Sequence, residues 1–63
     1  MCESNAYLRD GKKEVLIMKD VSRVDVEWER IILVDVMGNR KEVKGVLLQV
    51  DFDEHRFYIE RRE

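Results

Sequence analysis

Residues 6–18 have the sequence AYLRDGKKEVLIM, in which two runs of strand-forming residues flank the dipeptide Asp10-Gly11. An aspartate followed by glycine is a strong hairpin signal, because glycine accepts the positive φ that a type I′ turn requires. Apolar and polar side chains alternate from residue 2 to residue 9, which is the period of a β-strand. These residues therefore predict a hairpin whose second strand covers residues 14–18.

Four further strands are predicted from the same alternation and from the turn residues between them, at residues 23–27, 31–36, 42–52 and 57–60. Lys19-Asp20 separates the second strand from the third. Gly45 interrupts the alternation inside the fifth strand, as a bulge or a bend would. Six short strands with tight turns predict an all-β fold, a small antiparallel SH3-like barrel.

The composition agrees with one small folded module. At 63 residues the chain is one domain, residues 1–63, and 44% hydrophobic with 41% charged residues excludes both a disordered tail and a membrane span. Valine and isoleucine far outnumber alanine, and proline is absent, which favours strands. The net charge of −2, with both signs interspersed, gives no general polyanion-binding field, so nucleic acid and membrane partners are not expected.

The cysteine content and the first residues indicate the compartment. The chain has one cysteine, which cannot form an intrachain disulfide, and no apolar secretory segment follows Met1. We therefore expect a cytoplasmic protein.

Stabilising a core this small calls for a further contribution. A chain of this length buries only about 60% of the surface of its unfolded form, so a dimer or a metal is the natural candidate. Apolar residues also occupy the second face of several predicted strands, namely Leu16, Met18, Ile31, Leu33 and Leu47. These residues predict a homodimer, although the alternative is that some of them lie under loops.

Few residues are available for catalysis. Cysteine and histidine occur once each, at Cys2 and His55, and there is no CxxC pair, zinc-ligand spacing or glycine-rich phosphate loop. Nothing in the spacing brings Cys2 and His55 together as a nucleophilic dyad, and Asp51 and Asp53 are typical of solvated acids. We therefore do not expect an enzyme. His55 is either an exposed turn residue or a supporting metal ligand.

Cys2 is distinguished by its place beside the start of the chain. Its thiolate and its own nitrogen form a five-membered chelate, which the Met1 amine extends if Met1 is retained, or the Glu3 amide if Met1 is removed. Such an N,S donor set favours Ni(II) or Cu(II) over Zn(II). In a dimer, two chain starts could supply both thiolates to one ion. The alternative is an incidental thiol or a small hydrophobic residue.

Several segments resemble the CooT-type small nickel-binding proteins: residues 1–8 above all, with Met1-Cys2 at their start, and also Asp20-Val21, residues 34–38 and residues 50–56. This resemblance implies a homodimeric SH3-like protein of the cytoplasm that binds Ni(II) through Cys2. It also implies a role in nickel delivery during maturation of carbon monoxide dehydrogenase. The chain has no histidine-rich tail, which favours one ion per dimer over bulk storage.

A small RNA-binding barrel is the alternative function. Relatives in the same family have carried that description, and the chain offers basic residues and aromatic residues for base stacking: Arg40, Lys41, Lys44, Trp28, Phe52 and Tyr58. RNA affinity would fall steeply with salt, whereas nickel affinity would be nearly indifferent to it.

Overall fold

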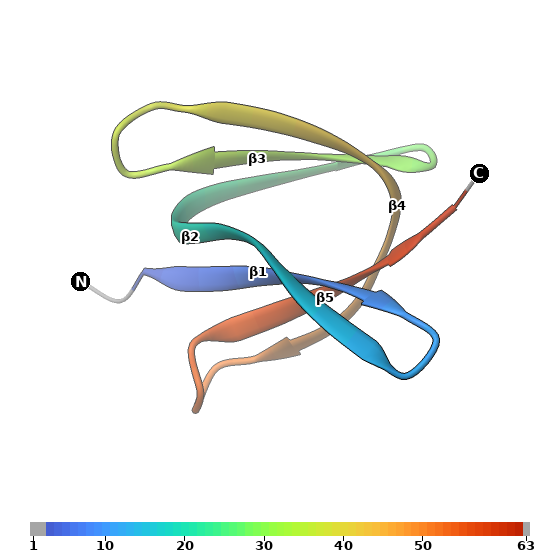
Figure 1. The fold of residues 1–63 in the computed structure, drawn as a ribbon. Helices are drawn as coiled ribbons and strands as arrows, with labels where there is room; N and C mark the ends of the chain where they lie inside the picture. The colour runs from blue at the N-terminus through green and yellow to red at the C-terminus, as the bar shows by residue number, and fades with distance from the viewer. Residues whose placement is uncertain (1–2, 63) are drawn as a thin grey trace.

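The computed structural model describes residues 3–62, which form five strands and thereby confirm the all-β prediction (Figure 1). The strands are β1 (Ser4–Asp10), β2 (Lys13–Glu27), β3 (Arg30–Asp35), β4 (Arg40–Asp51) and β5 (Arg56–Arg61). They hydrogen-bond in chain order and close into a barrel. Within residues 3–62 there is no helix long and apolar enough to cross a membrane.

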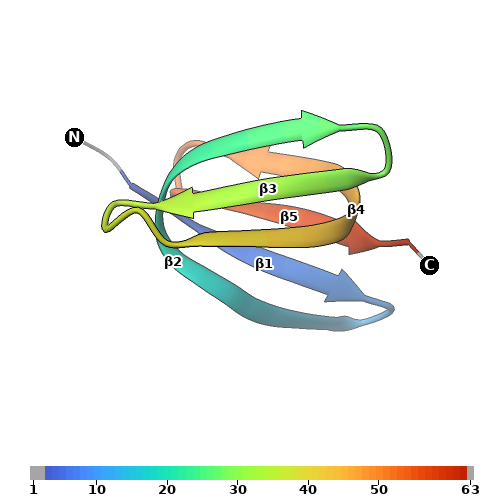
Figure 2. The same ribbon diagram turned by 90° about the horizontal axis from the view of Figure 1, so that it is seen from above.

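The barrel has an odd number of strands, and this determines how it closes. The four sequential pairs are antiparallel, so strand direction alternates and the first and fifth strands point the same way. The closing pair of β1 and β5 is accordingly parallel (Figure 2), and its register places Tyr7 opposite Tyr58. The prediction of six strands in a fully antiparallel arrangement is therefore wrong, and the SH3-like classification stays a prediction.

The structure has five strands and not six because two of the predicted strands are one, β2, which is continuous through residues 19 and 20. Asp20 adopts a left-handed conformation with φ of 55°, which bends the strand without ending it. Residues before the bend pair with β1, and Val21 pairs with Ser4 of β1 and with Asp35 of β3. Lys19-Asp20 is thus a bend at which one strand changes its partner, and not a turn between two strands.

Strand β4 changes its partner in the same way, as the bend predicted at Gly45 requires. Lys44 pairs with Arg30 of β3, and Gly45 already pairs with Arg61 of β5. A Cβ atom at Gly45 would lie 2.4 Å from the backbone oxygen of Glu60. Only glycine permits this close approach of two backbones.

The hydrophobic core draws on four of the strands: Ala6, Leu8, Val21, Ile31, Leu33, Phe57 and Ile59. The expectation that Ile31 and Leu33 lie on an outer face is wrong, because β3 directs both into the core. Met18 packs partly buried against it. Leu16 and Leu47 are exposed, as predicted.

The predicted hairpin turn is present with one difference in type. Asp10 pairs with Lys13, so the loop consists of Gly11 and Lys12. Of these two residues only Gly11 has a positive φ, 64°, and glycine at the first central position is the type II′ pattern. The sequence therefore located the hairpin correctly and assigned its turn type wrongly.

Candidate functional site

The barrel has two ends, and the end at which β1 begins is the candidate site. The bend at Asp20, the turn at residues 36–39 and the turn at residues 52–55 lie at this chain-start end, on the left of Figure 1. The turns at residues 11–12 and 28–29 lie at the opposite end. The chain-start end thus gathers three connections around the beginning of β1.

Two of the four predicted metal ligands, Met1 and Cys2, lie outside the described residues. The other two, Glu3 and His55, are exposed. His55 ends the turn before β5 with φ of 56°, and its carbonyl oxygen accepts a hydrogen bond of 2.9 Å from the Asn5 backbone N–H. This bond places His55 at the same end of the barrel as Glu3.

Asn5 joins two of the three connections. Its backbone N–H binds His55, and its side-chain Oδ1 accepts a hydrogen bond of 3.2 Å from the backbone N–H of Asp20. The Asp20 carbonyl in turn accepts a bond of 2.9 Å from the Val36 N–H. Sequence reasoning missed Asn5. Its only signal was a polar residue of low strand propensity inside a predicted strand.

The chain-start end is rich in carboxylates. Glu3, Asp20, Asp53 and Glu54 are all exposed there, and within the described residues Glu54 forms an ion pair with Arg56 at 3.4 Å. Carboxylates gathered at one end attract cations by summed potential, without being ligands themselves.

Asp51 has a structural role at the same end. Its Oδ1 accepts a hydrogen bond of 3.0 Å from the Glu54 backbone N–H, which stabilises the turn before β5.

Asp35 organises the turn at residues 36–39. Its carboxylate accepts hydrogen bonds from the Asn39 side chain at 3.0 Å and from the backbone N–H groups of Asn39 and Met37, each at 2.9 Å. These bonds, that from the Asn39 side chain first, lower the pKa of Asp35 below its usual value. The turn holds Met37 outward with 82% of its surface exposed.

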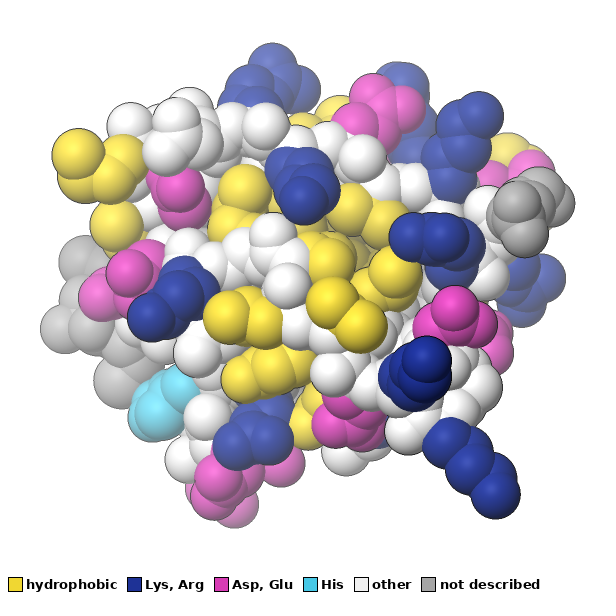
Figure 3. Space-filling view, in the orientation of Figure 1, with side chains coloured by type: hydrophobic (Ala, Val, Ile, Leu, Met, Phe, Trp, Pro, Cys, Tyr) yellow, Lys and Arg dark blue, Asp and Glu magenta, His cyan; other side chains and the backbone are white. Residues whose placement is uncertain are grey.

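An apolar groove opens beside the chain-start end. It has a volume of about 250 Å³, and its lining includes Ser4 of β1 and the apolar residues Val21, Val24, Leu47, Val50, Phe52 and Phe57. Phe52 is 83% exposed at its edge. Figure 3 shows hydrophobic side chains gathered on one face within a ring of charged ones.

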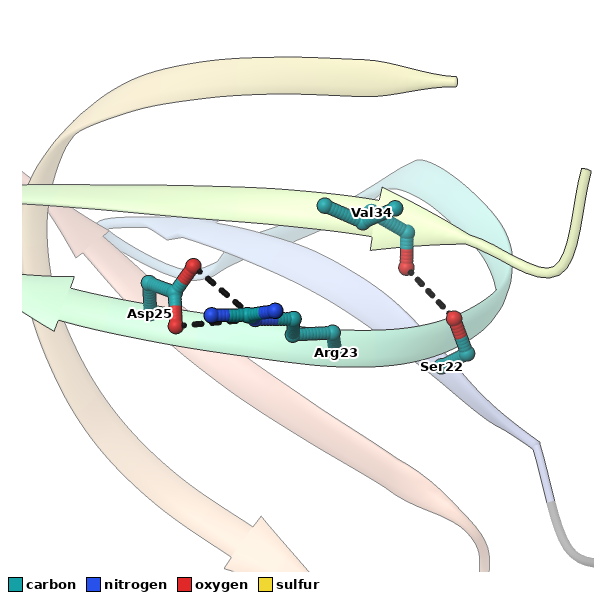
Figure 4. A network of polar contacts seen from close by, with 4 residues as sticks. All are labelled: Ser22, Arg23, Asp25 and Val34. Atoms are coloured by element: carbon teal, nitrogen blue, oxygen red, sulfur yellow. Dashed lines mark hydrogen bonds and ion pairs between the residues drawn. The ribbon is translucent and has the colours of Figure 1, made fainter. Parts of the chain in front are cut away.

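Arg23 lines this groove as well and is held by its own strand. Its Nε atom donates to both carboxylate oxygens of Asp25 at 3.1 Å (Figure 4). The neighbouring Ser22 hydroxyl donates to the Val34 carbonyl at 3.3 Å. The groove therefore has an apolar floor and one neutralised cation.

No metal cluster is complete within residues 3–62. That range contains no group of three or more His, Cys, Asp or Glu side chains placed to hold one ion. Glu3 and His55 share an end of the barrel but do not form a site by themselves.

The residues that suggested RNA stacking do not share a surface. Trp28 is 89% exposed in the turn at the opposite end, and Phe52 lies at the chain-start end. Tyr58 is only 7% exposed, because Arg9 lies over its ring at 4.5 Å and Tyr7 lies beside it with ring centroids 5.7 Å apart. The expectation of an exposed Tyr58 is wrong.

Comparison with known proteins gives consistent matches over nearly the whole chain. Residues 1–60 match the model of one family, described as CO dehydrogenase accessory protein CooT. An uncharacterized protein of Methanothermobacter thermautotrophicus is 40% identical over 63 residues, covering 100% of this chain and 94% of that protein.

Two further matches agree with these. An uncharacterized protein of Methanocaldococcus jannaschii is 33% identical over 60 residues, covering 95% of this chain and 98% of that protein. A crystal structure assigned to CooT from Carboxydothermus hydrogenoformans superposes with a TM-score of 0.90 at 29% identity, covering 98% of this chain and 100% of that one.

Proposed function

The chain belongs to the CooT family of CO dehydrogenase accessory proteins, and from this premise we propose that it binds Ni(II) as cargo and delivers it for maturation of CO dehydrogenase. An accessory protein of this family is not itself an enzyme. The proposal places the protein in the cytoplasm, where a single thiol stays reduced.

The proposed donor set is the start of the chain. The Cys2 thiolate is the essential ligand, and backbone nitrogen completes a chelate with the amine of Met1 or the amide of Glu3. His55 is a supporting ligand. The observation that carries this proposal is the 2.9 Å hydrogen bond between Asn5 and His55, which holds the only histidine of the chain against the strand that follows Cys2.

The chemistry of this donor set selects the metal. Thiolate with deprotonated amide nitrogen suits a square-planar ion, so Ni(II) and Cu(II) bind in preference to Zn(II). The exposed carboxylates at the chain-start end raise the local concentration of any divalent cation. Copper binds N,S sites more tightly than nickel does, so the availability of each metal in the cell decides which ion the site holds.

One chain start offers too few side chains for four ligands, so the proposal includes a homodimer that shares one ion. We place its interface on the apolar groove, with a second copy of the chain as the occupant. Ser4 lines this groove two residues after Cys2. A twofold axis through the groove would thus bring both chain starts together, and it would cover the exposed Phe52, Leu47 and Val50.

The test is an equilibrium titration of the reduced protein with Ni(II), Cu(II) and Zn(II), with the visible absorption spectrum recorded at each point. We expect submicromolar Ni(II) binding with one ion per two chains by native mass spectrometry, and a coloured thiolate complex. Affinity should fall with acidification, because binding expels protons from the thiol and the amide.

Cys2→Ser is the decisive variant, and we expect it to abolish submicromolar Ni(II) binding and the visible colour. The matched control is Ser4→Cys in the Cys2→Ser background, which restores a thiol two residues further along. Equal nickel affinity in Cys2→Ser and in the unmodified protein would overturn the assignment.

A further inference from the structure

We infer that Asn5 is a positioning residue for the proposed nickel site, because it fixes the start of β1 to the two left-handed residues other than glycine at the chain-start end. This inference rests on the proposed function. It concerns the geometry of the site and adds no ligand.

The first step is a bulge in the pairing of β1 with β2. Ser4 lies opposite Val21 and Ala6 lies opposite Met18, so the single residue Asn5 faces the two residues 19 and 20 of β2. A bulge leaves one residue without its regular ladder bond. The Asn5 side chain replaces the missing ladder bond, because its Oδ1 accepts a hydrogen bond of 3.2 Å from the Asp20 N–H.

The second step is that Asn5 contacts both of the left-handed residues of this end that are not glycine. Asp20 has φ of 55° and His55 has φ of 56°, a conformation that costs a residue other than glycine about 1 kcal/mol. The Asn5 side chain binds the first, and the Asn5 backbone N–H binds the second at 2.9 Å. One residue therefore holds both strained positions in place.

The third step connects this clamp to Cys2. Three residues of extended chain span at most about 10 Å, so Cys2 stays within that distance of Asn5 wherever the first residues lie. By fixing Asn5 relative to His55, the clamp limits the volume around His55 that the thiol can explore, and it reduces the entropy lost when the proposed site closes. In a shared site each ion depends on two such clamps.

The required chemistry is a short side chain with an acceptor oxygen. Asp retains that oxygen at the same length, whereas Ala removes it and Gln moves it outward by one methylene. Asn5→Ala and Asn5→Gln should therefore release the Asp20 half of the clamp while the backbone bond to His55 remains, and Asn5→Asp should preserve both halves.

The experiment compares these variants by amide hydrogen exchange of the metal-free protein and by titration with NiSO₄. Asn5→Ala should accelerate exchange of the Asp20 amide and weaken Ni(II) binding by up to roughly fivefold per clamp, hence roughly twentyfold for an ion held by two. It should also shift the thiolate absorption band. Asn5→Asp should restore both, and Asn5→Gln replaces Asn5→Ala if the latter does not fold.

Asn39→Ala is the matched control. It removes a side-chain hydrogen bond of 3.0 Å to the Asp35 carboxylate in the turn at residues 36–39, without touching β1 or the groove proposed as the dimer interface. If Asn39→Ala weakens nickel binding as much as Asn5→Ala, the effect is general destabilisation and the inference fails.

The remaining outcomes separate the inference from the proposed function. Unchanged nickel affinity in Asn5→Ala, with tight binding by the unmodified protein, overturns the positioning role and leaves the function intact. A blank titration of the unmodified protein overturns both.

Discussion

At both ends of the barrel a long strand bends and changes its pairing partner, but the residues that permit the bend differ. At each end one long strand leaves its first partner and joins a second: β2 does so at Asp20 and β4 at Gly45. At the opposite end the bend depends on the absence of a side chain, and the Gly45 N–H donates to the Glu29 carbonyl at 3.1 Å. At the chain-start end the bend depends on the presence of a side chain, because Asn5 Oδ1 accepts a hydrogen bond from the Asp20 N–H.

The two ends also differ in exposed apolar surface. The groove bordered by Phe52 belongs to the chain-start end, whereas exposed residues of both charges, among them Asp10, Lys12, Glu29 and Lys44, lie toward the other. A bend made with a side chain can be tuned by substitution, while a bend made by close backbone approach cannot.

Gly45→Ala should have the largest effect. The added Cβ would lie 2.4 Å from the Glu60 oxygen and 3.0 Å from a methyl carbon of Ile59, so β4 and β5 must separate. We expect a loss of about 3 kcal/mol in the free energy of unfolding, measured in urea. The control is Gly11→Ala, which meets no atom within 4 Å and costs only its backbone strain. Equal losses in the two variants would contradict the close-approach argument.

Phe52→Asp should have the next largest effect, on assembly. A carboxylate at the edge of the groove would be buried without a partner in the proposed dimer, so its dissociation constant should rise at least tenfold, a change of about 1.4 kcal/mol. Light scattering measures the shift to monomer. Trp28→Asp is the control, since Trp28 is equally exposed at the opposite end. A dimer that survives Phe52→Asp but not Trp28→Asp would place the interface at the other end.

The smallest effects are expected for Glu29→Gly and His55→Gly, one left-handed residue from each end. Glycine relieves strain of about 1 kcal/mol but gains entropy when unfolded, so each should stabilise by about 0.5 kcal/mol in thermal unfolding. Their nickel affinities should differ, because only His55→Gly removes a supporting ligand. Identical affinities would remove His55 from the ligand set.

Much of the fold was predictable because it depends on local signals. Asp10-Gly11 located the first hairpin, and Gly45 located the bend in β4. The strand count was not predictable, because Asp20 is an ordinary turn residue whose left-handed bend is stabilised by a distant residue, Asn5. The burial of Ile31 and Leu33 likewise depends on strand orientation in the closed barrel.

The sequence indicated which residues could bind a metal, but it did not indicate how they are arranged in space. A thiol beside Met1 and a single histidine identify candidate ligands from sequence, but the proposal that they share one ion requires the parallel pairing of β1 with β5. That pairing joins residues about fifty positions apart, Asn5 and Arg56 among them. No sequence pattern within either strand predicts this pairing, and for this reason the sequence analysis did not identify Asn5.

The closing pair has a consequence for biosynthesis. β1 is translated first among the strands but acquires its second neighbour only when β5 has been made, so the seam of the barrel is completed last. Such a long-range contact is slow to form. Until then the carbonyl of His55 has no partner in β1. Under the proposed function, translation would thereby set the earliest moment at which a metal is loaded.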